Sequence, residues 1–150
     1  MFENLTLLNG ISFRECTALQ YVNCNRVKLI SAHEFAGTNN AFVSLNSLES
    51  LQDTQITNAL LDGQGGKIRF KSIRSIGRNA ISSVCDYIIV DTDWVPALSP
   101  GNKISRAFVR DNLLQDFKLT EEWRDKTIFP MSDLDTLCPG HSDIWKKLDV

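Results

Sequence analysis

The stretch Val84-Cys85-Asp86-Tyr87-Ile88-Ile89-Val90 is the strongest strand candidate in the chain. All of its residues except Asp86 are apolar or aromatic, and it lacks the alternation of a strand with one face in solvent. Such a run is typical of a central strand that is buried on both faces. Two prolines, Pro96 and Pro100, interrupt regular structure soon after it. We therefore expect residues 84–90 to lie in the middle of a sheet.

Other strand candidates surround this one. Residues 67–73 alternate basic with apolar side chains, which predicts a strand with Ile68 and Phe70 in the core. The basic side chains of that strand, Lys67, Arg69 and Lys71, are expected in solvent. Further strands are expected at residues 4–8, 11–15, 27–32 and 41–45, the first two joined as a hairpin by Asn9-Gly10.

Helical spacing of apolar residues predicts three helices, which Ser47, Ser105 and Ser142 can cap. Glycines at 63, 65 and 66 are expected to end the first of them. The apolar residues that carry the patterns are Leu48, Leu51, Ala59 and Leu60 in the first helix, Val109, Leu113 and Phe117 in the second, and Ile144, Trp145 and Leu148 in the third.

The order of these elements is strands, a helix, strands and then helices. No internal repeat, linker or domain boundary is evident in the sequence. The regular alternation of a doubly wound fold is also missing. The sequence therefore predicts one α+β domain over residues 1–150, with a mixed, mainly antiparallel sheet and two or three packed helices.

Composition excludes several classes of protein. The chain has 150 residues, 16 of them basic and 18 acidic, and 43% are hydrophobic. These values exclude collagen-like and strongly charged disordered chains. The N-terminal residues lack the basic and apolar regions of a signal peptide, and the longest apolar run is too short to span a membrane. We expect a cytoplasmic protein with no membrane partner and with four reduced cysteines.

Asp91 and Asp93 are the best candidates for an enzymatic site. Two carboxylates at the end of an apolar strand can hold a divalent metal, as in phosphatases of the haloacid dehalogenase type and in nucleotidyltransferases. However, Trp94-Val95-Pro96 follows where the phosphatase motif continues with Gly-Thr. We therefore favour carboxylates that end a strand in solvent, and expect no metal, no cofactor and no catalytic residue.

Two further groups of side chains contain residue types that can bind a metal or a nucleic acid. Cys138 and His141 lie close together in sequence, but the chain lacks the remaining ligands of a zinc pattern, and a Pro-Gly turn before a helix explains them. The basic block at 67–78 lacks interleaved exposed aromatic residues, so direct binding of nucleic acid is not expected.

The segment from residue 111 to residue 150 carries nine acidic and five basic residues, a net charge of −4. Trp123 and Trp145 are interleaved with these acids, and Trp94 follows Asp91 and Asp93. Aromatic side chains framed by carboxylates suit an interface with a basic protein, although tryptophans buried in the core would explain the pattern equally well. The predicted partner-binding residues are Asp91, Asp93, Trp94, Asp116, Glu121, Glu122, Trp123, Asp125, Asp133 and Asp135.

About a third of the chain resembles immunity proteins of bacterial contact-dependent or polymorphic toxin systems. The stretches that carry the resemblance are Asp86-Tyr87-Ile88-Ile89-Val90-Asp91, Trp94-Val95-Pro96, Ile104-Ser105-Arg106-Ala107-Phe108-Val109 and Ile128-Phe129-Pro130, with the third expected to be helical. The resemblance implies a non-enzymatic antitoxin that neutralises a cognate toxin domain, such as a nuclease, by tight stoichiometric binding. The alternatives are a small metal-dependent phosphoryl- or nucleotidyl-transfer enzyme that uses Asp91 and Asp93, and a phage accessory structural subunit.

Overall fold

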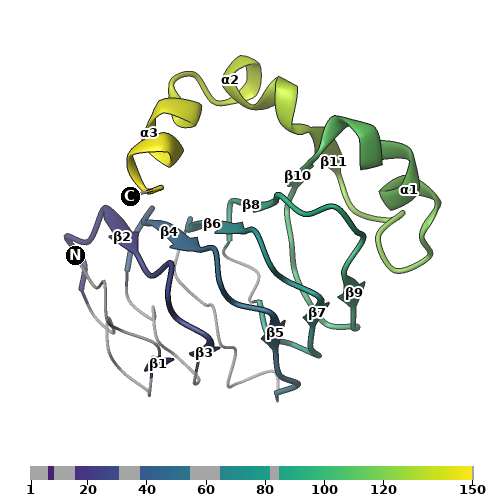
Figure 1. Ribbon diagram of the computed structural model, residues 1–150, viewed down its shortest axis with the longest axis horizontal. Coiled ribbons are helices and arrows are strands. Elements are labelled where there is room, and N and C mark those ends of the chain that lie inside the picture. The colour runs from purple at the N-terminus through teal and green to yellow at the C-terminus, as the bar shows by residue number, and fades with distance from the viewer. Residues whose placement is uncertain (1–6, 9–15, 31–37, 55–64, 82–84, 150) are drawn as a thin grey trace.

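The described part of the chain comprises residues 7–8, 16–30, 38–54, 65–81 and 85–149 of a computed structural model. Its largest element is a six-stranded parallel sheet in the order β11-β10-β8-β6-β4-β2 (Figure 1). Consecutive strands of this sheet begin 20 to 25 residues apart. They are β2 (Tyr21–Asn23), β4 (Phe42–Leu45), β6 (Lys67–Phe70), β8 (Tyr87–Val90), β10 (Ala107–Val109) and β11 (Ile128–Pro130).

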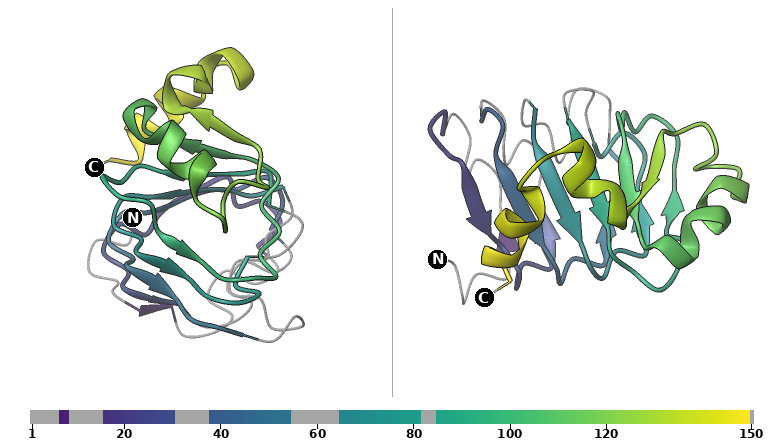
Figure 2. Two further views of the ribbon diagram at one scale, coloured as in Figure 1. Left: turned by 90° about the vertical axis from the view of Figure 1, so that its right-hand side faces the viewer. Right: turned by 90° about the horizontal axis from the view of Figure 1, so that it is seen from above.

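Between these strands the chain enters a second wall. The strands β5 (Ser50–Leu51), β7 (Ser75–Ile76) and β9 (Ala97–Leu98) form a three-stranded parallel sheet, and β1 (Leu7–Leu8) pairs in parallel with β3 (Leu29–Ile30). Along the chain, β4 is followed by β5, β6 by β7 and β8 by β9. The backbone therefore winds in stacked coils, in a β-solenoid-like arrangement (Figure 2).

The expected mainly antiparallel sheet with packed helices is wrong. Every strand pair in the described residues is parallel. A coil that returns to the same wall after about 20 residues runs in the same direction as the coil before it. The connection is also long enough for the crossover that parallel pairing requires, which is a dozen residues or more.

An apolar repeat underlies the coils, so the expected absence of repeats is also wrong. The buried positions follow one another at spacings of two, three and three residues. The first two positions lie in a strand of the large sheet or directly after it, and the later ones turn the corner into the second wall. The repeat is visible in Val22, Cys24, Val27 and Ile30, in Val43, Leu45, Leu48 and Leu51, and in Ile68, Phe70, Ile73 and Ile76, all at most 5% exposed.

This repeat explains why the start of the first predicted helix is wrong, whereas the second predicted helix is wrong only at its start. Leu48 and Leu51 are three residues apart because they belong to one coil, and Leu51 lies in β5 rather than on a helix. The rest of that prediction, residues 55–64, lies outside the described residues. Residues 107–109 form β10, where the resemblance and the spacing both called for a helix, and helix α1 (Leu114–Leu119) begins only later.

Three other expectations can be compared with the structure. The central, two-sided burial of the 84–90 strand is confirmed, because all four residues of β8 are at most 1% exposed and β8 lies between β6 and β10. The third helix is confirmed as α3 (His141–Lys147). Of the predicted N-terminal hairpin, Leu7–Leu8 forms β1. The predicted turn and second strand, residues 9–15, lie outside the described residues.

Buried side chains form two clusters, one on each face of the large sheet. The inner cluster fills the space between the walls and includes Phe70, Ile88 and Val109. The outer cluster lies under helices α2 (Leu134–Leu137) and α3, which cross the outer face of the sheet (Figure 2). Its members are Phe42, Tyr87, Ile89, Phe108, Leu134, Cys138, Trp145 and Leu148.

No helix in the described ranges has the length and apolar character that a membrane span requires.

Candidate functional site

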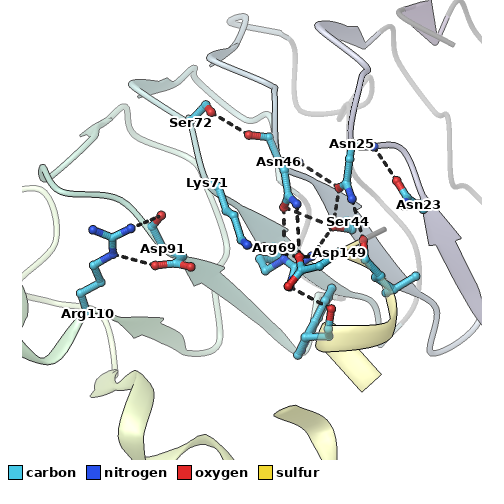
Figure 3. Close-up of polar contacts among 12 residues, drawn as sticks. Asn23, Asn25, Ser44, Asn46, Arg69, Lys71, Ser72, Asp91, Arg110 and Asp149 are labelled. Atoms are coloured by element: carbon cyan, nitrogen blue, oxygen red, sulfur yellow. Dashed lines mark hydrogen bonds and ion pairs between the residues drawn. The ribbon is translucent and has the colours of Figure 1, made fainter. Parts of the chain in front are cut away.

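Polar side chains line up across the outer face of the large sheet, at the carboxyl ends of its strands (Figure 3). The strand register places Asn23 beside Ser44 and Ser44 beside Arg69. Two residues further along five neighbouring strands come Asn25, Asn46, Lys71, Asp91 and Arg110. Because side chains two residues apart point to the same face of a strand, the parallel register gathers these groups into one row.

The first part of the row ties β2 and β4 to the segment after α3. The Ser44 hydroxyl donates to Asn25 Oδ1 at 2.5 Å, and Asn25 Nδ2 donates to the Leu148 carbonyl at 2.6 Å. The backbone N–H of Asn25 donates to Asn23 Oδ1 at 2.9 Å. These bonds hold Asn25 and Ser44 in fixed orientations.

Arg69 is the centre of the row, and only 4% of its surface is exposed. Its guanidinium donates from Nε to Asn46 Oδ1 at 3.1 Å, from Nη1 to the Trp145 carbonyl at 3.0 Å and from Nη2 to the Ser44 hydroxyl at 2.7 Å. The guanidinium also lies 5.1 Å from the centre of the Trp145 ring. Burial lowers the pKa of Arg69, and the carboxylate of Asp149 opposes that effect.

Asp149 supplies the negative charge at this point of the row. Its Oδ1 lies 2.6 Å from Arg69 Nη2 and 3.2 Å from Lys71 Nζ, and Asn46 Nδ2 donates to the same oxygen at 3.5 Å. The expectation that Lys67 and Arg69 point into solvent is therefore wrong, since they are 9% and 4% exposed. Their strand alternates as predicted, but α3 and the residues after it cover its outer face.

At the other end of the row, Asp91 and Asp93 bind Arg110. Arg110 Nε lies 2.7 Å from Asp91 Oδ1, and Nη1 pairs with Asp93. The hydrogen bond to Asp91 is the largest cause of the raised pKa of Arg110. A guanidinium thus occupies the place where the metal hypothesis puts a divalent cation. Among the described residues, no group of three or more His, Cys, Asp and Glu side chains could hold a metal ion.

Trp94 follows this pair and is only partly exposed. Its indole N–H donates to the Ile73 carbonyl at 2.7 Å, and the guanidinium of Arg74 lies 4.4 Å from the centre of the ring. Trp94 therefore holds the corner between two coils and shows part of its ring to solvent.

The other two tryptophans lie in the two cores. Trp123 is fully buried, donates to the Pro96 carbonyl at 2.7 Å and packs edge-on against Phe117 at 5.1 Å. Trp145 is 3% exposed and belongs to the outer cluster. Neither indole is available to a partner on the surface of the folded chain.

The acidic residues of the same segment lie at the surface. All nine acids of segment 111–149 are exposed, among them the predicted Asp116, Glu121, Glu122, Asp125, Asp133 and Asp135. Two leucines are exposed beside them, Leu119 by 78% and Leu137 by 42%. Along the chain, exposed leucines thus stand among these carboxylates, where the sequence predicted tryptophans.

Two of these acids, Asp111 and Asp135, also fix local turns. The backbone N–H of Ser132 donates to Asp111 Oδ1 at 3.1 Å, and that of Ser142 donates to Asp135 Oδ1 at 2.9 Å. Hydrogen bonds from the serine hydroxyls, and then those from the backbone N–H groups, lower the pKa of both carboxyl groups.

Cys138 and His141 lie in one cluster but bind different partners. Arg106 Nη2 is 3.3 Å from Cys138 Sγ, and His141 Nδ1 is 2.7 Å from the Tyr87 hydroxyl. Cys138 is 6% exposed, and it contributes to the outer apolar cluster. The arrangement agrees with the expected turn before α3, in which Gly140 has a φ of 81°.

Comparisons with known proteins identify no relative. No family model, no curated protein and no solved structure matches the chain.

Sequence reasoning missed Arg69, Lys71, Asn46 and Asp149 as a group. The signal that could have found them is the coil repeat. Once Val43 and Ile68 are aligned as equivalent positions, Ser44 falls beside Arg69 and Asn46 falls beside Lys71. The partner Asp149 has no such signal, because it comes from a segment outside the coils.

Proposed function

We propose that this chain is a protein-binding antitoxin that neutralises a basic toxin domain by stoichiometric binding. The observation that carries the proposal is the exposed acidic surface of segment 111–149, with Leu119 and Leu137 at its surface. Exposed leucines can supply apolar contact area at an interface, and surrounding carboxylates can steer a positively charged partner towards it. A basic nuclease that normally binds phosphate groups is a partner of suitable charge.

The support comes from charge and exposure rather than from the resemblance. The helix at 104–109 that the resemblance calls for is strand β10. The charge asymmetry itself persists in the fold, because eight of the nine acids are exposed without any carboxylate–cation pair shorter than 4 Å among the described residues, Asp149 being the exception. Segment 111–149 therefore keeps its acids at the surface, whereas Asp91 and Asp93 pair with Arg110 and Trp123 is lost as an anchor.

If a gene next to this chain's gene encodes a toxin domain, the test is co-expression of the two. We expect the chain to restore growth, and the two purified proteins to form a one-to-one complex in size-exclusion chromatography. Unrestored growth together with the absence of a complex would contradict the proposal. A chain in which Glu121 and Glu122 are both replaced by lysine should protect less well at equal expression.

The metal-dependent alternative makes a separate prediction about Asp91. It requires Mg²⁺ or Mn²⁺ binding that Asp91→Asn abolishes. We expect calorimetry to detect no such binding to the wild-type chain, because Arg110 already pairs with both carboxylates. Saturable Mg²⁺ binding that disappears in Asp91→Asn would favour the enzyme instead.

A further inference from the structure

The row of polar residues contains a cationic cluster, Arg69, Lys71 and Asn46, whose donors already hold an anionic group. Arg69 and Lys71 contribute two positive charges, and Asn46 adds an amide donor. All three reach a single oxygen, Oδ1 of Asp149, at 2.6, 3.2 and 3.5 Å (Figure 3). Donors that converge on one oxygen suit the anionic oxygen of a carboxylate or of a phosphate equally well.

Groups other than Asp149 also orient the cationic cluster. Three N–H groups of Arg69 bind neutral acceptors on Asn46, Ser44 and the Trp145 carbonyl, so its guanidinium is oriented by groups other than the carboxylate. The Trp145 ring packs beside it. A buried guanidinium stays charged and is costly to bury without an anion. Without the Asp149 carboxylate, the cationic cluster would therefore attract a replacement anion.

Asp149 is a replaceable occupant. Its side chain is 39% exposed and that of Lys71 is 35% exposed, so Asp149 Oδ1 lies at the edge of the cationic cluster, within reach of solvent. Asp149 follows α3, and that helix is held by Trp145 and Leu148, which are 3% and 8% exposed. The other carboxylate that acts on Arg69 is Asp91, and it is already paired with Arg110.

We propose that Arg69, Lys71 and Asn46 form a binding site for an anionic oxygen group of an external ligand, a carboxylate or a phosphate, and that Asp149 occupies this site in the free protein. The ligand displaces the Asp149 carboxylate into solvent, and α3 stays in place. The site lies on the sheet face, and the proposal does not depend on the acidic surface or on a toxin partner.

The experiment is an NMR titration with inorganic phosphate or acetate at constant ionic strength, with chloride as the balancing salt. It follows the amides of Arg69 and Lys71 and the indole N–H of Trp145. Asp149→Asn removes the competing negative charge. Asp143→Asn is the matched control on α3, because Asp143 has no contact with the cationic cluster among the described interactions. We expect Asp149→Asn to lower the apparent Kd for at least one anion by about tenfold or more, because the site no longer has to expel its own carboxylate.

Lys71→Ala in the Asp149→Asn background should raise that apparent Kd again. Preference for acetate would assign the site to a carboxylate ligand such as an acidic peptide, and preference for phosphate to a phosphorylated one. The proposal would be overturned if Asp149→Asn and Asp143→Asn bound acetate and phosphate with equal affinity. It would also be overturned if Lys71→Ala left the anion affinity of Asp149→Asn unchanged. If Asp149→Asn disturbs the Trp145 and Leu148 amides before any anion is added, the wild-type chain decides, since its anion binding must weaken in Lys71→Ala.

Discussion

The Tyr87 hydroxyl lies 2.7 Å from Nδ1 of His141, and the Trp145 indole N–H lies 3.0 Å from the same hydroxyl oxygen. Because an indole N–H can only donate, the Tyr87 oxygen accepts from Trp145, and Tyr87 and His141 share a second hydrogen bond whose donor depends on the imidazole tautomer. Burial first, and then the charge of Lys67, lowers the pKa of His141. This chain of bonds joins β8 to α3 and sets His141 in a place that favours its neutral form.

The stability of the fold should therefore decrease in mildly acidic solution. A lowered pKa in the folded state means that the unfolded chain takes up the proton first, near pH 6.5. The contribution of His141 is thus fully present above about pH 6.5 and is lost as the pH falls towards the folded-state pKa. We expect the urea concentration at the midpoint of unfolding of the wild-type chain to be lower at pH 5.5 than at pH 7.5.

His141→Asn is the control for this effect. Its side-chain oxygen can accept the Tyr87 hydrogen bond, and it does not titrate in this range. Its urea midpoint should depend less on pH than that of the wild type. His33 is present in both proteins and cancels from the comparison. Equal pH dependence of the two midpoints would contradict the assignment.

Trp145→Ala should strongly destabilise the protein. The ring is 3% exposed and packs edge-on against Phe42 at 5.4 Å. Removing a buried tryptophan side chain costs about 3–5 kcal/mol. Leu119→Ala is the control at 78% exposure, and it should change the free energy of unfolding by less than about 0.5 kcal/mol. Chemical denaturation measures both, and similar losses would mean that the outer cluster contributes little.

Gly77→Ala should disrupt the stacking of two coils. A Cβ atom there would overlap the backbone of Gln52 and Asp53 in the preceding coil. The Gly77 N–H also donates to the Leu51 carbonyl at 2.7 Å, so the two backbones cannot easily separate. Gly140→Ala meets no atom and strains only its positive φ, which costs about 1–2 kcal/mol. Thermal unfolding should show a larger loss for Gly77→Ala, and the reverse order would contradict close coil packing.

Charge reversal on the acidic surface should slow the association with a basic partner. In a chain with Glu121→Lys and Glu122→Lys, we expect the association rate at low salt to fall on the order of tenfold, with a smaller change in dissociation. Glu49→Lys reverses an exposed charge beside β5 and is the matched control. Stopped-flow measurements at several salt concentrations provide the test. An unchanged rate and an unchanged salt dependence would place the interface elsewhere.

The sequence predicts individual strands better than it predicts how they pair. The apolar run through Ile88 and Ile89 identifies a central strand, because burial on both faces is visible locally. The direction of pairing is set by the length of a coil, and an apolar spacing of three, as at Leu48 and Leu51, suits a solenoid corner as well as a helix. Recognising the repeat would have resolved that ambiguity.

Individual site residues show the same limit. Asp91 and Asp93 follow a strand as predicted, but their partner Arg110 lies in the next coil, where only the register reveals it. Arg69 alternates correctly with Phe70, yet it is buried because α3 returns over β6. That contact spans 76 residues, and no local pattern in the sequence encodes it.

The bond between Asn25 and Leu148 joins residues 123 positions apart, one just after β2 and the other just after α3, outside the coils. In a solenoid without such a bond, each coil depends on its neighbours, and either end can fray alone. Here the segment that fastens β2 is synthesised after all of the described coils. Coils formed early in synthesis must wait for it with the outer face of β4 and β6 uncovered, which makes this interval the time when the nascent chain is most exposed to aggregation.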